Sequence, residues 1–274
     1  MKILIPMSGP ETAFEQAGQR HGKWLMEIHA RPLVQHVFEN LQSACADSFI
    51  FVIRKEYNAR YHLADVLRLM APGCDVVVAD GPTAGAACTA LLAIERINPE
   101  EELLIANGDQ ILLADLNAIL DEFRERKLDA GTIVFDSIHP RWSYVRLNTQ
   151  SGLVVEATEK RPISRLATAG IYYFRRGGDF CDAASGMIRK GAHVNGAYYV
   201  CPCFNELILR QLRVGVHQIS GEQYYSLATP QGVERYTQLE PGKSTPPPRV
   251  PTREILDAVA ARRIPPREMR PARA

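Results

Sequence analysis

The sequence of 274 residues predicts an α/β protein with one large domain. Two observations support this class. Short apolar runs closed by turn residues, typical of buried parallel strands, occur at 2–6, 48–53, 75–79, 102–106 and 131–135. Apolar residues at helical spacing follow several of these runs, for example at 33–41, 61–70 and 116–123. Strands that alternate with helices favour a sheet covered by helices on its faces.

The composition narrows the classes of function. Apolar residues make up 46% and charged residues 23% of the chain, so most of it can bury a core and is not disordered. A formal net charge of +1 argues against nucleic acid as a partner. No apolar stretch reaches the roughly 20 residues that a membrane span needs, and the N-terminus shows no secretion signal. We therefore expect a cytoplasmic protein that acts on small molecules without a membrane partner.

The first predicted strand, 2–6, leads into a loop that contains Met7, Ser8 and Gly9. The residues of this loop neither continue a strand nor start a long helix, which is typical of a loop that faces phosphate. A dinucleotide-binding fold would need three spaced glycines here, and the loop offers one. Dehydrogenase chemistry of the Rossmann type is therefore disfavoured.

Lys23 lies between a polar stretch, 15–22, and the first predicted helix. A lysine in this position can reach a polyphosphate as a point charge. An exposed surface lysine is the commoner meaning of such a residue.

Residues 80–93 begin with Asp80 and Gly81 and continue through Gly85 into an alanine-rich helix. Gly85 would let the backbone approach a flat ligand while the N–H groups of the helix face it. A plain strand-to-helix turn with small residues for packing is equally compatible with this pattern.

The most informative stretch is the apolar run that ends in Asn107, Gly108 and Asp109. Ligands of open α/β sheets bind at the carboxyl ends of strands, and Mg²⁺ takes one or two carboxylates there. Alternatively, Asp109 caps a turn or the next helix. As a loop carboxylate, Asp109 is expected to contribute little to stability.

Further strands are predicted at 143–147, 153–156 and 169–174. Between the last two, Glu159 and Lys160 precede Arg161 and Pro162, a set suited to gripping sugar hydroxyls and a phosphate. An exposed ion pair in a turn is the commoner meaning of this set.

The last segment, 241–274, is rich in proline and has an excess of basic residues, which does not suit a packed core. One short helix is predicted there, with Thr252 as its N-cap. The chain thus divides into a domain of residues 1–240 and a tail of residues 241–274 that docks on its own domain or on a partner.

Together these motifs, in this order, resemble those of the sugar-phosphate nucleotidyltransferases, the NDP-sugar pyrophosphorylases of the glucose-1-phosphate thymidylyltransferase type. The resemblance covers roughly residues 2–236. The matching segments are 5–9 for the nucleotide loop, Lys23 for the lysine element, 30–33, 81–85 for the base-binding segment, 107–109 for the metal-binding Gly-Asp, 159–162 for the sugar-phosphate grip, 204–206 and 227–230.

The resemblance implies a three-layer α/β/α Rossmann-like nucleotidyltransferase fold, similar to the GT-A fold, with a mixed, mainly parallel sheet. It implies transfer of a nucleotidyl group from an NTP to a sugar 1-phosphate with release of pyrophosphate, supplying an activated sugar for surface polysaccharide synthesis. It leaves a homo-oligomer open and assigns Mg²⁺ to Asp109, which acts in catalysis with Lys23. The implied nucleotide-binding residues are Met7, Ser8, Gly9, Asp80, Gly81, Gly85, Asn107 and Gly108, and the implied substrate-binding residues are Glu159, Lys160, Gly170 and Asn205.

Several positions depart from the family pattern, among them Gly22 and Trp24, which stand in place of the two prolines of the lysine element. Ala13 stands in place of the arginine that would contact the triphosphate, Glu11 replaces a glycine near the phosphate oxygens, and Ser226 replaces the second metal carboxylate. These departures motivate an alternative, a catalytically weak or silent homologue that binds nucleotide or sugar phosphate in a regulatory or partner role. They also predict that exchanging Glu11 for glycine and Ala13 for arginine raises NTP affinity. If the loop is rearranged, the nearest cations in the sequence are Arg20 and Arg31.

Overall fold

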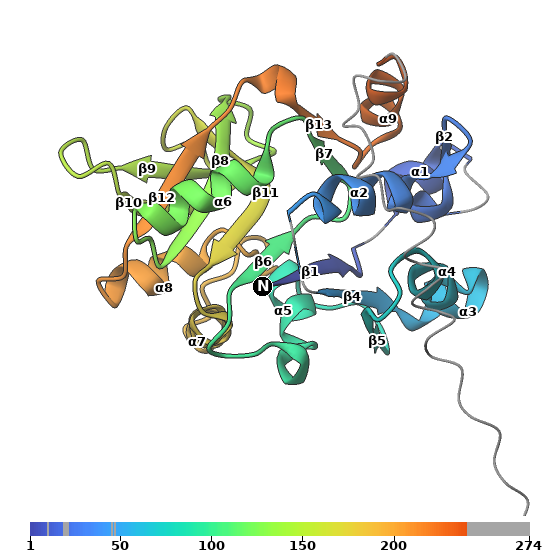
Figure 1. The fold of residues 1–274 in the computed structure, drawn as a ribbon, viewed down its shortest axis with the longest axis horizontal. Helices are drawn as coiled ribbons and strands as arrows, with labels where there is room; N and C mark the ends of the chain where they lie inside the picture. Colours follow the sequence, from blue (N-terminus) through green and yellow to red (C-terminus); the bar gives the residue numbers. More distant parts are fainter. Residues whose placement is uncertain (10, 19–21, 45, 47, 240–274) are drawn as a thin grey trace, which may run out of the picture.

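The computed structural model describes residues 1–9, 11–18, 22–44, 46 and 48–239, and the predicted tail of 241–274 lies outside them. A nine-stranded sheet forms the centre of the described chain (Figure 1). Its strands are β1 (Lys2–Met7), β4 (Ser48–Arg54), β5 (Asp75–Ala79), β6 (Leu103–Ala106), β8 (Ala130–Asp136), β9 (Ser143–Leu147), β10 (Val154–Glu159), β11 (Leu166–Phe174) and β12 (Val214–Gln218).

The sheet follows the order β10-β9-β11-β6-β1-β4-β5, while β8 pairs with both β11 and β12. Strands β1, β4, β5 and β6 are mutually parallel, and β12 is parallel to β8. Strand β11 pairs antiparallel with β6, β8 and β9, and β10 pairs antiparallel with β9. Thus β10 and β11 run opposite to the other strands of this sheet, which confirms the prediction of a mixed, mainly parallel sheet.

Helices cover both faces of the sheet and give the predicted three layers (Figure 1). One face carries α2 (Leu33–Gln42), α3 (Lys55–Tyr61), α4 (Leu63–Met70) and α6 (Leu116–Glu125), and the other carries α5 (Ala86–Leu91), α7 (Gly177–Arg189) and α8 (Cys203–Leu209). Successive side chains of a strand point to opposite faces. In β1, Ile3 and Ile5 therefore join the first cluster and Leu4 the second.

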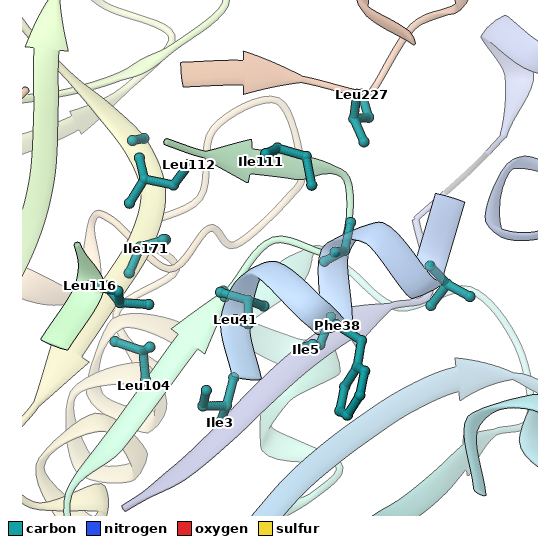
Figure 2. Close-up of a cluster of buried hydrophobic side chains, with 14 of the residues drawn as sticks. Ile3, Ile5, Phe38, Leu41, Leu104, Ile111, Leu112, Leu116, Ile171 and Leu227 are labelled. Carbon is teal, nitrogen blue, oxygen red and sulfur yellow. The ribbon is translucent and has the colours of Figure 1, made fainter. Parts of the chain in front are cut away.

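The first apolar cluster extends beyond the sheet to a small two-stranded element. Strands β7 (Gln110–Leu112) and β13 (Tyr224–Ser226) pair antiparallel, and Figure 2 shows Ile111 and Leu227 above helix α2. Phe38 and Leu41 of that helix belong to the same cluster as Ile3 and Ile5 of β1 (Figure 2). Helix α2 is thus buried between the main sheet and the β7–β13 pair, which fixes the chain on either side of Asp109.

The remaining described elements are short. They are α1 (Thr12–Gln16), β2 (Glu27–Ile28), β3 (Arg31–Pro32), α9 (Pro230–Thr237), and three 3₁₀ turns, η1 (Lys23–Leu25), η2 (Ile94–Arg96) and η3 (Gly221–Gln223). No helix in the described part of the chain combines the length and the apolar character needed to span a bilayer.

Candidate active site

A cavity of about 660 Å³ opens at the carboxyl ends of β1, β4 and β6. This is the edge where open α/β sheets bind ligands. The cavity brings together most of the residues that the sequence nominates: Ser8, Gly9, Lys23, Gly85, Asn107, Gly108, Asp109, Glu159 and Gly170. Segments that lie far apart in the chain therefore contribute to one site.

Lys23 and Asp109 form an ion pair inside this cavity. The Lys23 Nζ donates to Asp109 Oδ2 at 2.8 Å, and the Lys23 side chain is only 6% exposed. The same ammonium lies 4.2 Å from the centre of the Trp24 ring. Lys23 is therefore a buried residue of the cavity and not the exposed surface lysine that is commoner for this residue type.

Glu11 holds the backbone at Lys23. Its Oε2 accepts the Lys23 backbone N–H at 2.9 Å, and the side chain is buried outside the cavity wall. Burial raises the pKa of the Glu11 carboxyl above its ordinary value. Gly22 has a φ of +68°, and a Cβ there would meet Glu11 and Tyr61. The Glu11 carboxylate is thus bonded to the backbone of the lysine segment and does not line the cavity.

Gly170 fixes the loop that presents Asp109. Its carbonyl oxygen accepts the Asn107 backbone N–H at 2.9 Å and the Gln110 side-chain amide at 3.1 Å. Its φ is +65°, and a Cβ would collide with the side chains of Asn107 and Gln110, so only glycine fits. On the other side, the Leu227 N–H donates to the Asp109 carbonyl at 2.7 Å.

Asp109 does not cap the next helix, because the cap of α6 is Asp115, which accepts the N–H of Ala118. Across the β7–β13 pair, Ser226 lies opposite Gln110, next to Asp109, and Ser226 also lines the cavity. The described residues contain no group of three or more His, Cys, Asp or Glu side chains that could hold a metal alone. One carboxylate beside a hydroxyl fits a hard cation that takes its other ligands from phosphate and water.

Three hydroxyl groups line the cavity beside the first loop. Thr89 Oγ1 lies 2.5 Å from Ser8 Oγ and 2.6 Å from Thr83 Oγ1. Gly85, nearby, has a φ of +108°, and a Cβ there would collide with the Tyr198 backbone. The close approach at Gly85 is thus made by the chain's own backbone, as the packing interpretation of this segment requires.

The opposite end of the cavity is lined by groups from β9 and β10. Ser143 donates to the buried Glu159, and burial raises the pKa of that carboxyl. Lys160 does not line the cavity itself, but its Nζ donates to the Tyr199 hydroxyl at 2.8 Å, and Tyr199 does line it. This hydrogen bond raises the pKa of Lys160. An acid, Glu159, a base, Lys160, and the Tyr199 ring thus lie at this end of the cavity.

Besides Lys160, four nominated residues lie away from the cavity wall. Met7 is buried in β1, and Asp80 pairs with Lys55 at 3.2 Å on the surface. Gly81 has open space around its Cα. Asn205 bonds the backbone N–H and C=O of Ala157 at 2.9 and 2.8 Å and so joins α8 to β10.

Sequence reasoning also left several residues of the wall without a nomination, although Pro6, Pro82, Thr83 and Ala228 lie within segments that it matched to the family. These are Pro6, Trp24, Arg54, Pro82, Thr83, Ala86, Thr89, Arg141, Trp142, Ser143, Thr168, Tyr172, Ala197, Tyr199, Val200, Tyr224 and Ala228. For Arg54 a signal was present, because it directly follows an apolar strand, as Asn107 does. For the aromatic residues no motif marks their position.

Comparison with known proteins places this geometry in a family. The sequence model of one protein family, the MobA-like NTP transferase domain, matches residues 16–169, which are more than half of the chain. The UTP–glucose-1-phosphate uridylyltransferase AglF of Haloferax volcanii is 25% identical over 180 residues, which are 64% of this chain and 72% of AglF.

Two solved structures share the fold. The nucleoside-diphosphate-sugar pyrophosphorylase of Vibrio cholerae RC9 is 23% identical with a TM-score of 0.76, over 86% of this chain and 100% of the other. A UDP-glucose pyrophosphorylase complexed with UDP-glucose is 15% identical with a TM-score of 0.67, over 86% and 96%. The family match carries the assignment: the chain belongs to the MobA-like NTP transferase domains and is a nucleotidyltransferase.

Proposed function

We propose that this nucleotidyltransferase transfers the nucleotidyl group of an NTP to a sugar 1-phosphate and releases pyrophosphate. The observation that carries the proposal is the Lys23–Asp109 pair, 2.8 Å apart in the wall of the cavity. Glycines and hydroxyl groups line the cavity beside the first loop, and Glu159 and Tyr199 line its other end. The name of the AglF relative, a uridylyltransferase for glucose 1-phosphate, agrees with this substrate class. The activated sugar would supply surface polysaccharide synthesis.

In the proposed reaction, a phosphate oxygen of the acceptor attacks the α-phosphorus of the NTP. The new oxygen–phosphorus bond forms as the bond from the α-phosphorus to the bridging oxygen breaks, and that oxygen leaves with pyrophosphate. The chain contributes position and charge, and no protein nucleophile is needed. Lys23 holds positive charge near the α-phosphate, and Glu159 orients the sugar by accepting hydrogen bonds from its hydroxyls. Mg²⁺ held by Asp109 would neutralise charge on the phosphates.

The direct test incubates the purified chain with Mg²⁺, each common NTP and a panel of sugar 1-phosphates. Pyrophosphate release is followed by a coupled assay, and the nucleotide sugar is identified by mass spectrometry. Lys23→Ala should lower the rate by roughly 10²- to 10³-fold. Lys55→Ala is the matched control, because the Lys55 side chain is 68% exposed and lies outside the cavity wall. Absence of pyrophosphate and product with every pair would refute the proposed function.

A further inference from the structure

In the described part of the first loop, 7–9 and 11–18, no residue supplies the cation that a triphosphate site of this kind is expected to have. Ala13 lies in α1, is exposed and does not line the cavity. Arg31 is also outside the wall and pairs with Glu39 at 2.6 Å. Arg20 lies outside the described residues. Within the described chain, a cation for this part of the cavity therefore has to come from another element.

Arg54 supplies a guanidinium at this place. It is the last residue of β4, which pairs in parallel register with β1, so that Met7 lies beside Ile53. Arg54 is therefore level with Ser8, where β1 leaves the sheet. Its side chain is 17% exposed and lines the same cavity as the Lys23–Asp109 pair.

The neighbouring helix α3 fixes the Arg54 side chain against the first loop. Arg54 Nη1 donates to the Tyr57 hydroxyl at 3.1 Å, and that hydroxyl donates to the Gly9 carbonyl at 3.2 Å. The guanidinium carbon lies 4.9 Å from the centre of the Tyr57 ring, and Nη2 donates to Glu56 at 3.0 Å. Each Nη nitrogen carries two hydrogens and uses one of them in these contacts, so each has a second N–H left to donate. The group is thus oriented, charged and able to bind more oxygens.

The other cations of the cavity wall do not replace it. Lys23 pairs with Asp109 and is assigned above to the α-phosphate, and Arg141 lies just before β9. From β4 to β9 the sheet order crosses four strand spacings, on the order of 19 Å at about 4.8 Å each. Arg141 is therefore at the end of the cavity that holds Glu159. The loop end of the described wall has Arg54 as its cation.

We propose that Arg54 binds the part of the NTP that leaves as pyrophosphate, in place of an arginine on the first loop. This inference rests on the proposed function. In-line displacement requires the acceptor and the leaving group on opposite sides of the α-phosphorus. With the acceptor at the β9–β10 end and the Lys23–Asp109 pair between, the leaving group lies toward β4. The planar, permanently charged guanidinium of Arg54 can bind two phosphate oxygens at once at this place.

The test measures binding to Arg54→Ala, Arg54→Gln and Arg54→Lys variants by calorimetry with three probes: inorganic pyrophosphate, an NTP and its nucleoside monophosphate, each with Mg²⁺. Arg54→Ala and Arg54→Gln should weaken pyrophosphate and NTP roughly 10- to 100-fold, while the monophosphate changes within about twofold. Arg54→Lys should recover part of the loss, since it keeps charge but not the fork. Arg60→Ala is the matched control, because Arg60 stacks on Tyr61 outside this cavity wall.

Unchanged NTP and pyrophosphate affinity in Arg54→Gln would overturn the role of Arg54, even with an active parent enzyme. An equal loss for all three probes would also overturn it, because that pattern indicates a collapsed site. Thermal melting identifies any variant that misfolds. Because Arg54→Lys keeps the positive charge, its affinity shows whether the other two variants lose binding through lost charge or through misfolding. Failure of the proposed function is seen separately, as absence of NTP binding and pyrophosphate release in the unmodified chain.

Discussion

Exchange of Asp109 for asparagine should remove activity and also lower stability, because Asp109 is the partner of a buried lysine. The Lys23 side chain is 6% exposed and that of Asp109 is 23% exposed, with Nζ and Oδ2 at 2.8 Å. Loss of one partner costs about 3 to 5 kcal/mol for a fully buried pair and about 0 to 1 kcal/mol at the surface. We expect about 2 kcal/mol for this pair, since water screens the aspartate. This value replaces the expectation from the sequence that a loop carboxylate at this position contributes little to stability.

For a domain of this size, such a loss lowers the melting temperature by roughly 4 to 8 °C. Differential scanning calorimetry of Asp109→Asn measures the shift, and the pyrophosphate assay measures activity. The double variant Lys23→Met with Asp109→Asn should recover most of the melting temperature, because it leaves no unpaired charge, but no activity. Asp80→Asn is the matched control, an aspartate with a 93% exposed side chain that pairs with Lys55, and should melt as the parent does.

A melting temperature of Asp109→Asn equal to that of the parent would refute the reasoning, since the lysine would then need no carboxylate. Loss of stability with full activity would show that Asp109 is structural and that no metal depends on it. Equal destabilisation in the single and the double variant would mean that the two side chains do not interact.

Three further predictions follow from the same geometry. Ser226→Asp should lower the Mg²⁺ concentration needed for half-maximal pyrophosphate release, because it adds a second carboxylate beside Asp109, and calorimetry with Mg²⁺ and NTP should show tighter binding. Glu11→Gln should flatten the pH dependence of stability. Because the pKa of the Glu11 carboxyl is raised in the folded chain, the fold loses stability as the pH rises from the ordinary pKa through the raised one. Urea unfolding between about pH 4 and pH 8 measures this effect, with Glu15→Gln as the control. Gly85→Ala should lower the melting temperature by several degrees, because its φ of +108° and the backbone opposite leave no room for a Cβ, whereas Gly81→Ala has open space and should not.

Much of the fold could be predicted because a buried parallel strand has a recognisable sequence pattern, a short apolar run closed by a turn residue. The strand 75–79 has the bounds of β5, and the apolar run 102–106 differs from β6 by one residue. A polar residue directly after such a run must lie at the ligand-binding edge, so the sequence alone places Asn107 and Asp109 there. Helix α7 and strand β12 carried no comparable signal and were not predicted, and α8 was indicated only by the matched segment 204–206.

The interior of the site could not be predicted, because its contacts join distant segments. Lys23 and Asp109 are 86 residues apart, and their meeting depends on how η1 packs under α2 and how β7 pairs with β13. Asn205 belongs to a matched family motif, yet its side chain bonds the backbone of β10. A motif gives the residue type at a position, whereas the side chain's direction follows from the packing of several elements.

Glu11 shows why a departure from a family pattern has to be judged in its own structure. Taken as a lone exchange of glycine for glutamate, it adds a negative charge near a triphosphate, and its replacement by glycine together with Ala13→Arg is expected to raise NTP affinity. In the folded chain its carboxylate accepts the Lys23 backbone N–H, and a glycine would remove that acceptor from a buried donor. The segment that carries Lys23 would lose its anchor, and with it the position of the Lys23 ammonium in the cavity. The double exchange therefore removes the anchor of the lysine segment and adds an arginine at an exposed position of α1 outside the cavity wall.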